Sequence, residues 1–296
     1  MDRDPTSAGL RIGELSRRVG VSEHVLRAWE SRYRLLTPAR SDGGYRLYSA
    51  DDERRVRRMQ AYLARGLAAA QAAQAVLAGE QPGASDDAEE PALADLAGAT
   101  DALRQALDGL DEQGAQSVLD RLLSAYTVQT VLRDVLLPYL HELGERWESG
   151  IVTVGQEHFA SNVIRGRLSN LARGWGNGAG PQALLACPPG ELHDLSLLAF
   201  GIVLNRAGWR ISYLGADTPI DDLIAVTTST RPSLVVLAAT TPDRFATVER
   251  ELSQLAALAP LAVAGAGATE RLAARIDARL LAADAVTAAE RVATRT

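Results

Sequence analysis

The side chains best suited to chemistry in this chain are Glu191 and His193, which directly follow a turn-forming segment at residues 188–190. An imidazole binds a metal through one ring nitrogen, and a carboxylate can accept a hydrogen bond from the other nitrogen. Such a partner fixes the ring and raises its basicity. A histidine beside an acid also arises by chance on protein surfaces, so the meaning of this pair depends on the rest of the chain.

A second set of candidate side chains lies near the N-terminus, where arginines surround two helix and turn signals. Ser22 is a good helix N-cap and predicts a helix over residues 22–32, entered from a turn at Gly20-Val21. Gly43-Gly44 predicts a tight turn between two short extended segments. A helix followed by such a wing places its first turns against base edges and its arginines against phosphates. We expect Trp29 to lie in the core of this unit.

The charge distribution supports an anionic partner for this end of the chain. The 296 residues carry a net charge of −6, and every basic residue is arginine. Residues 1–78 hold 14 Arg against 9 acids, giving +5, whereas residues 79–296 hold 17 Arg against 28 acids, giving −11. A basic end on an acidic body is typical of a protein that binds nucleic acid through one domain.

The elements that must position these residues fall into three folded parts and a linker. We expect a winged helix-turn-helix over residues 1–78 and an acidic linker over 79–92, because the linker is polar and contains Pro and Gly. Apolar residues at three- and four-residue spacing predict a four-helix bundle over 93–178, in which Pro138 begins or kinks a helix. Short apolar runs alternating with helical segments over 179–296 predict an α/β doubly wound (Rossmann-like) sheet of five parallel strands.

The N-terminal part resembles MerR-type regulators. The resemblance covers roughly residues 10–78 and lies in the motifs IGEL at 12–15, LRAWE at 26–30 and GYRLY at 44–48. It implies a dimer on a pseudo-palindromic site in double-stranded promoter DNA, within a homo-oligomer that is a dimer or a tetramer. The implied contacts with DNA are Arg27, Tyr45 and Arg46, with Arg17, Arg18 and Arg40 either as further contacts or as solvated surface. Tyr48 offers a second hydroxyl to the DNA backbone.

The C-terminal part resembles cobalamin-binding domains, through Glu191-Leu192-His193, the segment WRISYLGADTP at 209–219 and GAG at 265–267. This resemblance implies that His193 is the lower axial ligand to cobalt and that Gly265 and Gly267 leave room for the nucleotide tail of the cofactor. The expected position of His193, directly after the first predicted strand of the sheet, agrees with a role in ligand binding, since ligands of open α/β sheets bind outside the carboxyl ends of the strands.

The helical part adds a motif that is similar to the cap of CarH/LitR-type photoreceptors: Trp147, nine intervening residues, then Glu157-His158. The resemblance implies adenosylcobalamin, with Trp147 over the adenosyl group and Glu157 and His158 nearby. A large flat ring can stack on a nucleoside and exclude water, and a carboxylate can accept its hydroxyls. Without this resemblance, Trp147 would be an ordinary core residue, and Glu157 and His158 would form a solvated helix face.

Four positions depart from the pattern of these families. Ser196 and Ala264 replace glycines, Ala238 replaces a serine that would hydrogen-bond the nucleotide tail, and Glu148 replaces a histidine after the cap tryptophan. Added β-carbons take up space near the tail, and losing the serine removes a hydrogen bond worth ~1 kcal/mol. The sequence therefore leaves open weakened cobalamin binding, another corrinoid form, or another flat ligand.

The sequence as a whole predicts a transcriptional repressor that senses adenosylcobalamin and, through this cofactor, light. The alternative is a MerR-type regulator whose altered C-terminal domain senses another ligand or serves only for oligomerisation. An enzyme is disfavoured because no substrate domain or nucleophile–base arrangement accompanies the cofactor domain. No apolar run approaches the ~18–20 residues of a membrane span, and no leader is evident, so we expect a cytoplasmic location without a membrane partner.

Overall fold

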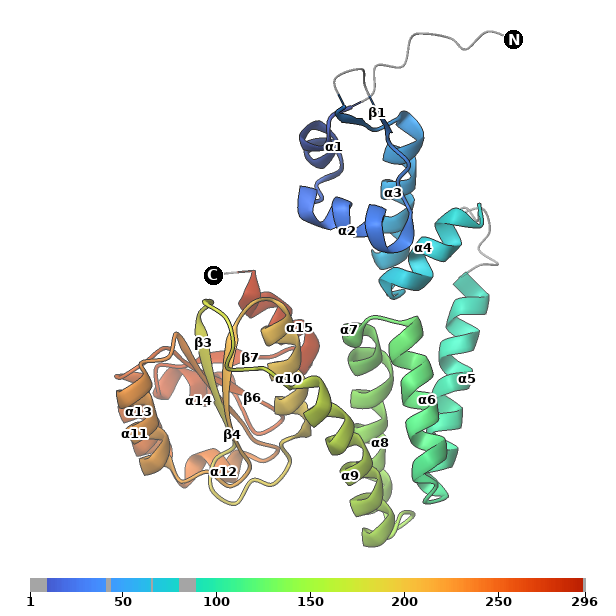
Figure 1. The fold of residues 1–296 in the computed structure, drawn as a ribbon. Coiled ribbons are helices and arrows are strands. Elements are labelled where there is room, and N and C mark those ends of the chain that lie inside the picture. Colours follow the sequence, from blue (N-terminus) through green and yellow to red (C-terminus); the bar gives the residue numbers. More distant parts are fainter. Residues whose placement is uncertain (1–9, 41–43, 65, 80–88, 295–296) are drawn as a thin grey trace, which may run out of the picture. The chain divides into compact units, whose positions relative to one another are not determined.

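The computed structural model describes residues 10–40, 44–64, 66–79 and 89–294. The chain, whose elements are labelled in Figure 1, divides into two compact units. The first contains Met1–Ala106 and Gln113–Val131, and the second contains Leu107–Glu112 and Leu132–Thr296. Within the described residues, no helix is long and apolar enough to cross a membrane.

The N-terminal part of the first unit is a winged helix-turn-helix. Ser22 caps the second helix as expected, since its Oγ accepts a hydrogen bond from the backbone N–H of Val25. Trp29 packs in the core with Leu15, Leu26 and Met59, so its expected core position is confirmed. The elements are α1 (Ile12–Val19), α2 (Glu23–Tyr33), β1 (Ala39–Arg40), β2 (Arg46–Leu47), α3 (Ala50–Ala64) and α4 (Ala69–Leu77).

The wing consists of the antiparallel strands β1 and β2, in which Arg40 lies directly opposite Arg46. Gly44, which enters β2, has a φ of 77°, a left-handed conformation that glycine adopts at little cost. The other glycine of the expected turn, Gly43, lies outside the described residues.

Residues 89–171 are helical over most of their length. The elements are α5 (Glu89–Asp108), α6 (Glu112–Ala125), α7 (Val128–Val131), the π-helical turn η2 (Leu132–Leu136), α8 (Leu137–Glu148) and α9 (Val154–Leu171). Pro138 lies in the first turn of α8, directly after the π-helical turn η2, so the prediction that it begins or kinks a helix is confirmed.

The linker predicted over residues 79–92 was drawn too long. Residues 80–88 lie outside the described residues, but α5 already begins at Glu89, so residues 89–92 are helical. The acidic pair Glu89-Glu90 and Pro91 suggested a polar linker. The same residues are also favourable in the first turn of a helix, where acids interact with the helix dipole and proline loses no hydrogen bond.

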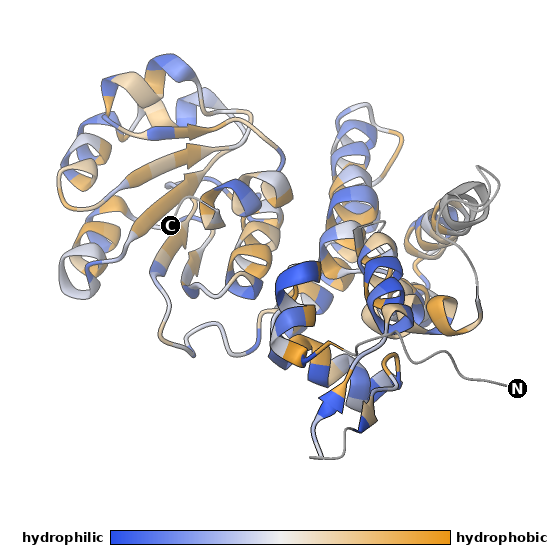
Figure 2. Ribbon diagram, turned by 90° about the horizontal axis from the view of Figure 1, so that it is seen from above, coloured by the Kyte–Doolittle hydropathy of each residue, from blue (hydrophilic) through white to orange (hydrophobic). Residues whose placement is uncertain are grey.

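The C-terminal part of the second unit is a five-stranded sheet whose strands are all parallel, as expected, in the order β4-β3-β5-β6-β7. The strands are apolar along much of their length (Figure 2). Helices α10 and α15 pack together on one face, and α11 to α14 contribute to the core on the other. The elements are β3 (Gln182–Ala186), α10 (Leu195–Arg206), β4 (Arg210–Gly215), α11 (Ile220–Thr230), β5 (Leu234–Ala238), α12 (Pro242–Ala246), α13 (Glu249–Ala256), β6 (Leu261–Ala264), α14 (Glu270–Arg275), β7 (Arg279–Leu281) and α15 (Ala285–Ala293).

This strand order creates one place where a ligand is favoured. The chain adds β4 on one side of β3 and then continues on the other side with β5, so the connections leave β3 and β5 in opposite directions. In open α/β sheets the crevice at such a switch point, outside the carboxyl ends of the strands, is the usual binding site. His193 follows β3, so the fold places it at this switch point.

Candidate cofactor site and nucleic-acid interface

The loop after β3 holds His193 by a hydrogen bond to Glu191. The Glu191 Oε1 atom accepts hydrogen bonds from the His193 backbone N–H (2.9 Å) and from the ring Nδ1 (2.6 Å). The Glu191 side chain is only 1% exposed, whereas that of His193 is 73% exposed. The carboxylate is therefore enclosed by protein, and the ring projects from the loop into solvent.

Thr240, in the loop after β5, fixes the other oxygen of Glu191. Its backbone N–H and its hydroxyl donate to Glu191 Oε2 at 2.6 and 2.7 Å. Burial opposes ionisation of Glu191, but the hydrogen bonds from Thr240 and His193 outweigh it and lower the pKa of this carboxyl to about 2. Glu191 is consequently an anion at neutral pH, and it joins the loops on both sides of the switch point.

An ionised Glu191 determines which nitrogen of His193 is available. A carboxylate only accepts hydrogen bonds, so the proton of the neutral ring lies on Nδ1 and the lone pair lies on Nε2. Nε2 has no partner among the described residues, and the ring is exposed. The described residues contain no group of three or more His, Cys, Asp and Glu side chains that could hold a bare metal ion. What His193 offers is therefore a single exposed imidazole nitrogen whose orientation is fixed by Glu191.

The residue after His193 is held from two sides. Asp194 is buried, and Arg165 of α9 donates two hydrogen bonds to its carboxylate, to Oδ2 at 2.9 Å and to Oδ1 at 2.6 Å. The Tyr213 hydroxyl of β4 donates a third to Oδ2 at 2.7 Å. Burial opposes ionisation of Asp194, but the hydrogen bonds from Arg165 and Tyr213 outweigh it and lower the pKa of this carboxyl.

The two glycines expected to make room for the cofactor are required by the protein itself. A β-carbon on Gly265 would lie 2.3 Å from the carbonyl oxygen of Ala239, and one on Gly267 would lie 2.4 Å from that of Thr241. The turn after β6 therefore packs directly on the loop after β5. Whether the glycines also face a ligand stays a prediction.

Two of the positions that depart from the family patterns lie at the same edge of the sheet. Ala238 and Ala264 end β5 and β6 and lie opposite each other in register. Ser196 is exposed in the first turn of α10. Thr240 lies two residues after Ala238, so a hydroxyl is present in this loop, where it binds Glu191.

The tryptophan of the helical motif is not a core residue. Trp147, near the end of α8, is 44% exposed, and Ile151 and Val154, a few residues further along the chain, are more exposed still. Glu157 of α9 accepts a hydrogen bond from Ser161 at 2.6 Å, and the neighbouring His158 is exposed. An uncovered indole ring is available to a ligand, although its role as a cap stays a prediction.

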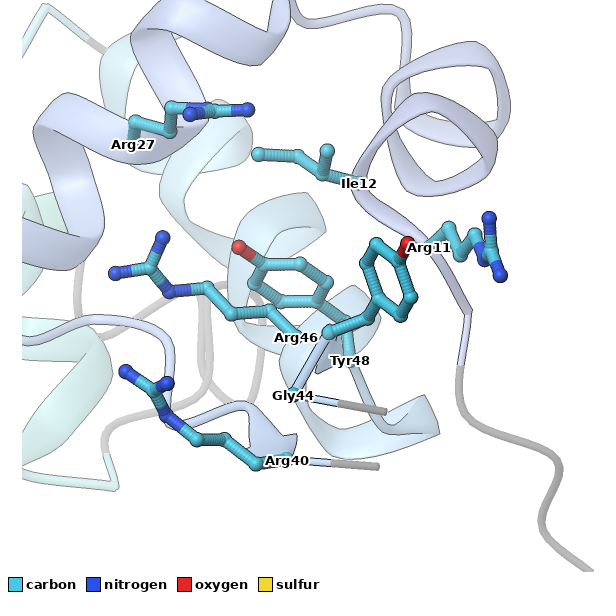
Figure 3. Close-up of a pocket in the computed structure, with 8 residues that line it drawn as sticks. Arg11, Ile12, Arg27, Arg40, Gly44, Arg46 and Tyr48 are labelled. Carbon is cyan, nitrogen blue, oxygen red and sulfur yellow. The ribbon is translucent and has the colours of Figure 1, made fainter. Parts of the chain in front are cut away.

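In the first unit, a hollow of about 300 Å³ lies between the wing, the start of α1 and the recognition helix α2 (Figure 3). Arg40 and Arg46 come from opposite positions of β1 and β2, and Arg27 comes from α2. Like charges directly opposite each other across two strands repel, so this surface favours an anion. The lining residues are Arg11, Ile12, Arg27, Arg40, Gly44, Tyr45, Arg46 and Tyr48.

Glu30 holds the wing in place. Its Oε1 lies 3.0 Å from Arg46 Nε, and its Oε2 accepts a hydrogen bond from the Tyr48 hydroxyl at 2.8 Å. Tyr48 is fully buried, so the expectation that its hydroxyl faces the DNA backbone is wrong. Tyr45 is exposed instead, and the Arg11 guanidinium lies 4.8 Å from the centre of its ring.

The hollow does not include every arginine named from the sequence. It brings together Arg27, Arg40, Tyr45 and Arg46, whereas Arg17 and Arg18 lie on α1 outside its lining. Arg18 forms ion pairs with Glu14 (2.9 Å) and Glu53 (3.6 Å).

Several residues at the two sites were not identified from the sequence. Arg11 and Glu30 stand inside or next to the motifs at 12–15 and 26–30, and their contacts depend on how the wing folds back. Arg165, Tyr213 and Thr240 lie far along the chain from the residues that they bind. Asp194 had a local signal, because it follows His193 directly.

A DNA-reading winged helix and a doubly wound domain with an exposed, oriented histidine define a ligand-responsive transcription regulator. Comparison with known families assigns residues 10–78 to the MerR HTH family of regulatory proteins, and residues 99–172 and 181–294 to two B12 binding domain families. The chain is 36% identical over 269 residues to the HTH-type transcriptional repressor CarA of Myxococcus xanthus, covering 89% of this chain and 88% of that protein. It is 34% identical over 238 residues to the repressor CarH of the same organism, covering 77% and 78%. The chain belongs to this family of MerR-type repressors with B12-binding domains, which are regulators and not enzymes.

A solved structure supports the fold of about two thirds of the chain. The Methanosarcina barkeri monomethylamine corrinoid protein matches 66% of this chain and 96% of its own length, with a TM-score of 0.55 and 18% sequence identity. At this identity the match shows a shared fold.

Proposed function

We propose that this protein is a repressor that binds promoter DNA as a homo-oligomer and senses adenosylcobalamin, and through it light. The observation that carries the proposal is His193, whose Nδ1 is fixed by Glu191 and whose ring is exposed at the switch point, in a chain that also carries the winged helix. A reader of promoter DNA works where the DNA is, so the proposal keeps the cytoplasmic location. It also keeps the domain limits expected from the sequence, except that the linker ends before Glu89, where α5 begins.

The residues at the switch point are suited to provide a nitrogen ligand to cobalt. His193 would offer Nε2 as the lower axial ligand, and Glu191 would hold the ring and increase its basicity through the Nδ1–H bond. Thr240 would keep the carboxylate in place. Adenosylcobalamin, when bound, supplies a cobalt–carbon bond that light breaks. Ser196, Ala238, Gly265 and Gly267 would lie along the nucleotide tail.

The helical residues would act on the other side of the cofactor. Trp147 would cover the adenosyl group and exclude water, because its ring is large, flat and uncovered. Glu157 would accept hydrogen bonds from the sugar hydroxyls, with His158 beside it. Glu148, in the position after the tryptophan, provides no imidazole there.

The DNA contacts would come from the wing and the recognition helix. Arg27 would reach base edges or phosphates from α2, while Arg40, Tyr45 and Arg46 would bind the phosphate backbone in the hollow of the wing. Arg17 and Arg18 would add weaker contacts from α1.

The decisive experiment is an absorbance titration of the full chain with adenosylcobalamin in the dark, repeated after green light. For the wild type we expect stoichiometric binding and a spectral change on illumination. In His193→Ala we expect loss of the absorbance features that report coordination of cobalt by the histidine. Absence of binding would show that Ser196, Ala238 and Ala264 have closed the site, leaving a regulator that senses another ligand.

The DNA contacts are tested by Arg46→Ala. We expect weaker binding and a shallower dependence of log affinity on log salt, because one phosphate contact is lost. Arg250→Ala, which removes an exposed arginine of α13, is the matched control. Equal slopes in the wild type and Arg46→Ala would remove Arg46 from the DNA interface.

A further inference from the structure

The proposed binding of cofactor and DNA does not use the ion pair between Arg165 and Asp194. This pair joins helix α9 to the start of the α/β domain. Arg165 belongs to α9, and Asp194 begins α10 immediately after His193. Both guanidinium Nη atoms donate to the carboxylate, and the Asp194 side chain is only 5% exposed. Paired hydrogen bonds between charged groups fix direction as well as distance.

Asp194 cannot move independently of its surroundings. Its backbone carbonyl accepts the hydrogen bond from Leu198 N–H that starts α10, and that helix is buried from Leu197 to Leu204. Its carboxylate is held by Arg165 and, at 2.7 Å, by the Tyr213 hydroxyl. Because α10 is packed against the sheet, a displacement of the chain at residues 193–194 has to change the contacts of this carboxylate.

Helix α9 carries a second set of residues on the same side as Arg165. His158 precedes Arg165 by seven residues, which is close to two full turns, so the two side chains share one face of α9 about 10 Å apart. Glu157 is the neighbour of His158. One rigid helix therefore bears both the residues assigned to the upper side of the cofactor and the partner of the residue next to His193.

We propose that the Arg165–Asp194 pair transmits the coordination state of His193 to helix α9, with Arg165, Asp194 and Tyr213 as positioning residues. This inference rests on the proposed function. When His193 gains or loses an axial bond, its loop shifts, and the pair either moves α9 with it or breaks. The helical part thus responds to the lower side of the cofactor as well as to the upper side.

The test is amide hydrogen exchange on the full chain, without ligand and with adenosylcobalamin in the dark. In the ligand-free protein, Arg165→Met should raise the exchange rate of amides 191–195 by roughly tenfold or more, because a buried carboxylate loses its charged partner. Arg165→Lys, which keeps the charge but only one donor direction, should show a smaller rise. With ligand, the wild type should change exchange in both this loop and α9, and Arg165→Met only in the loop.

Arg133→Met is the matched control. It removes another ion pair between the helical part and the α/β domain, with Glu290 of α15 at 2.7 Å, that lies on different elements. We expect this variant to leave amides 191–195 unchanged. If Arg165→Met does not fold, Tyr213→Phe removes one hydrogen bond from the same carboxylate and should raise exchange at the same amides.

Three outcomes would overturn the proposal: wild-type exchange at residues 191–195 in the variants, a ligand response of α9 that persists in Arg165→Met, or the lack of any ligand response of α9 in the wild type. Failure of the proposed function looks different, because the wild type would then leave the adenosylcobalamin spectrum unchanged. A normal spectrum with an unresponsive α9 contradicts only the link.

Discussion

Glu191 determines which ring nitrogen of His193 is available. Its two carboxylate oxygens accept four hydrogen bonds, two from His193 and two from Thr240. In Glu191→Gln the amide nitrogen cannot accept, so either Thr240 or His193 loses its partner. We expect the affinity for adenosylcobalamin to fall roughly tenfold or more, as for other partners of metal-bound histidines. Asp243→Asn, which changes an exposed acid of α12, is the control for charge alone. Equal affinities for the wild type and Glu191→Gln would show that the carboxylate is dispensable.

The burial of Cys187, which directly follows β3 and precedes the loop of His193, can also be tested. The thiol is fully buried, and burial raises its pKa to about 12. The thiolate fraction at pH 8 is then about one in ten thousand, so an aromatic disulfide reagent should not label the native chain. The denatured chain should react completely. Rapid labelling of the folded protein at pH 8 would contradict the burial of this residue.

The residues that sequence reasoning identified are those whose partners are local. Glu191 and His193 are two residues apart, so their contact could be expected from spacing alone. Thr240 is 49 residues from Glu191, and their contact depends on β5 lying next to β3. Tyr45 and Tyr48 carry the same hydroxyl, and their sequence positions do not show which of the two is exposed. Only the fold shows that Tyr48 is buried against Glu30 while Tyr45 is exposed.

Among the elements, those with a strong apolar period were predictable, and boundaries that depend on polar residues were not. The alternation of short apolar runs with helices predicted five parallel strands, but it did not give their order, which follows from packing across both faces. The start of α5 was misplaced because Glu89, Glu90 and Pro91 occur both in linkers and in first turns of helices.

The turn after β6 allows a test of what its glycines do. In Gly267→Ala the new β-carbon meets the carbonyl of Thr241 at 2.4 Å, and backbone cannot move aside as a flexible side chain can. We expect the ligand-free protein to lose about 1–3 kcal/mol of stability in denaturant unfolding, as for other overpacked sites. Gly144→Ala in α8, where a β-carbon meets nothing within 4 Å, should be neutral or slightly stabilising. If Gly267→Ala weakened only cofactor binding, the glycine would serve the ligand instead of the fold.

At the scale of the whole molecule, the charge distribution limits how one chain can hold DNA. The basic surplus of +5 is confined to residues 1–78, and the remaining residues carry −11. One winged helix offers Arg27, Arg40 and Arg46 in a single hollow, which is enough for a few phosphates at one half-site. We therefore expect tight binding to a promoter to involve two winged helices on one DNA, so that oligomerisation and DNA affinity change together.

This coupling predicts how ligand state and DNA binding are related. Size-exclusion chromatography and electrophoretic retardation of promoter DNA should be compared for the ligand-free chain, the chain with adenosylcobalamin in the dark, and the same sample after green light. We expect the more highly associated state to retard DNA at roughly hundredfold lower protein concentration, the scale of gain that two linked contacts provide. Trp147→Ala should reduce the difference between the dark and illuminated samples, because its ring is assigned to the adenosyl side of the cofactor. If DNA affinity is the same in all association states, or highest for the monomer, then oligomerisation is not the means by which the cofactor domain controls the DNA-binding domain.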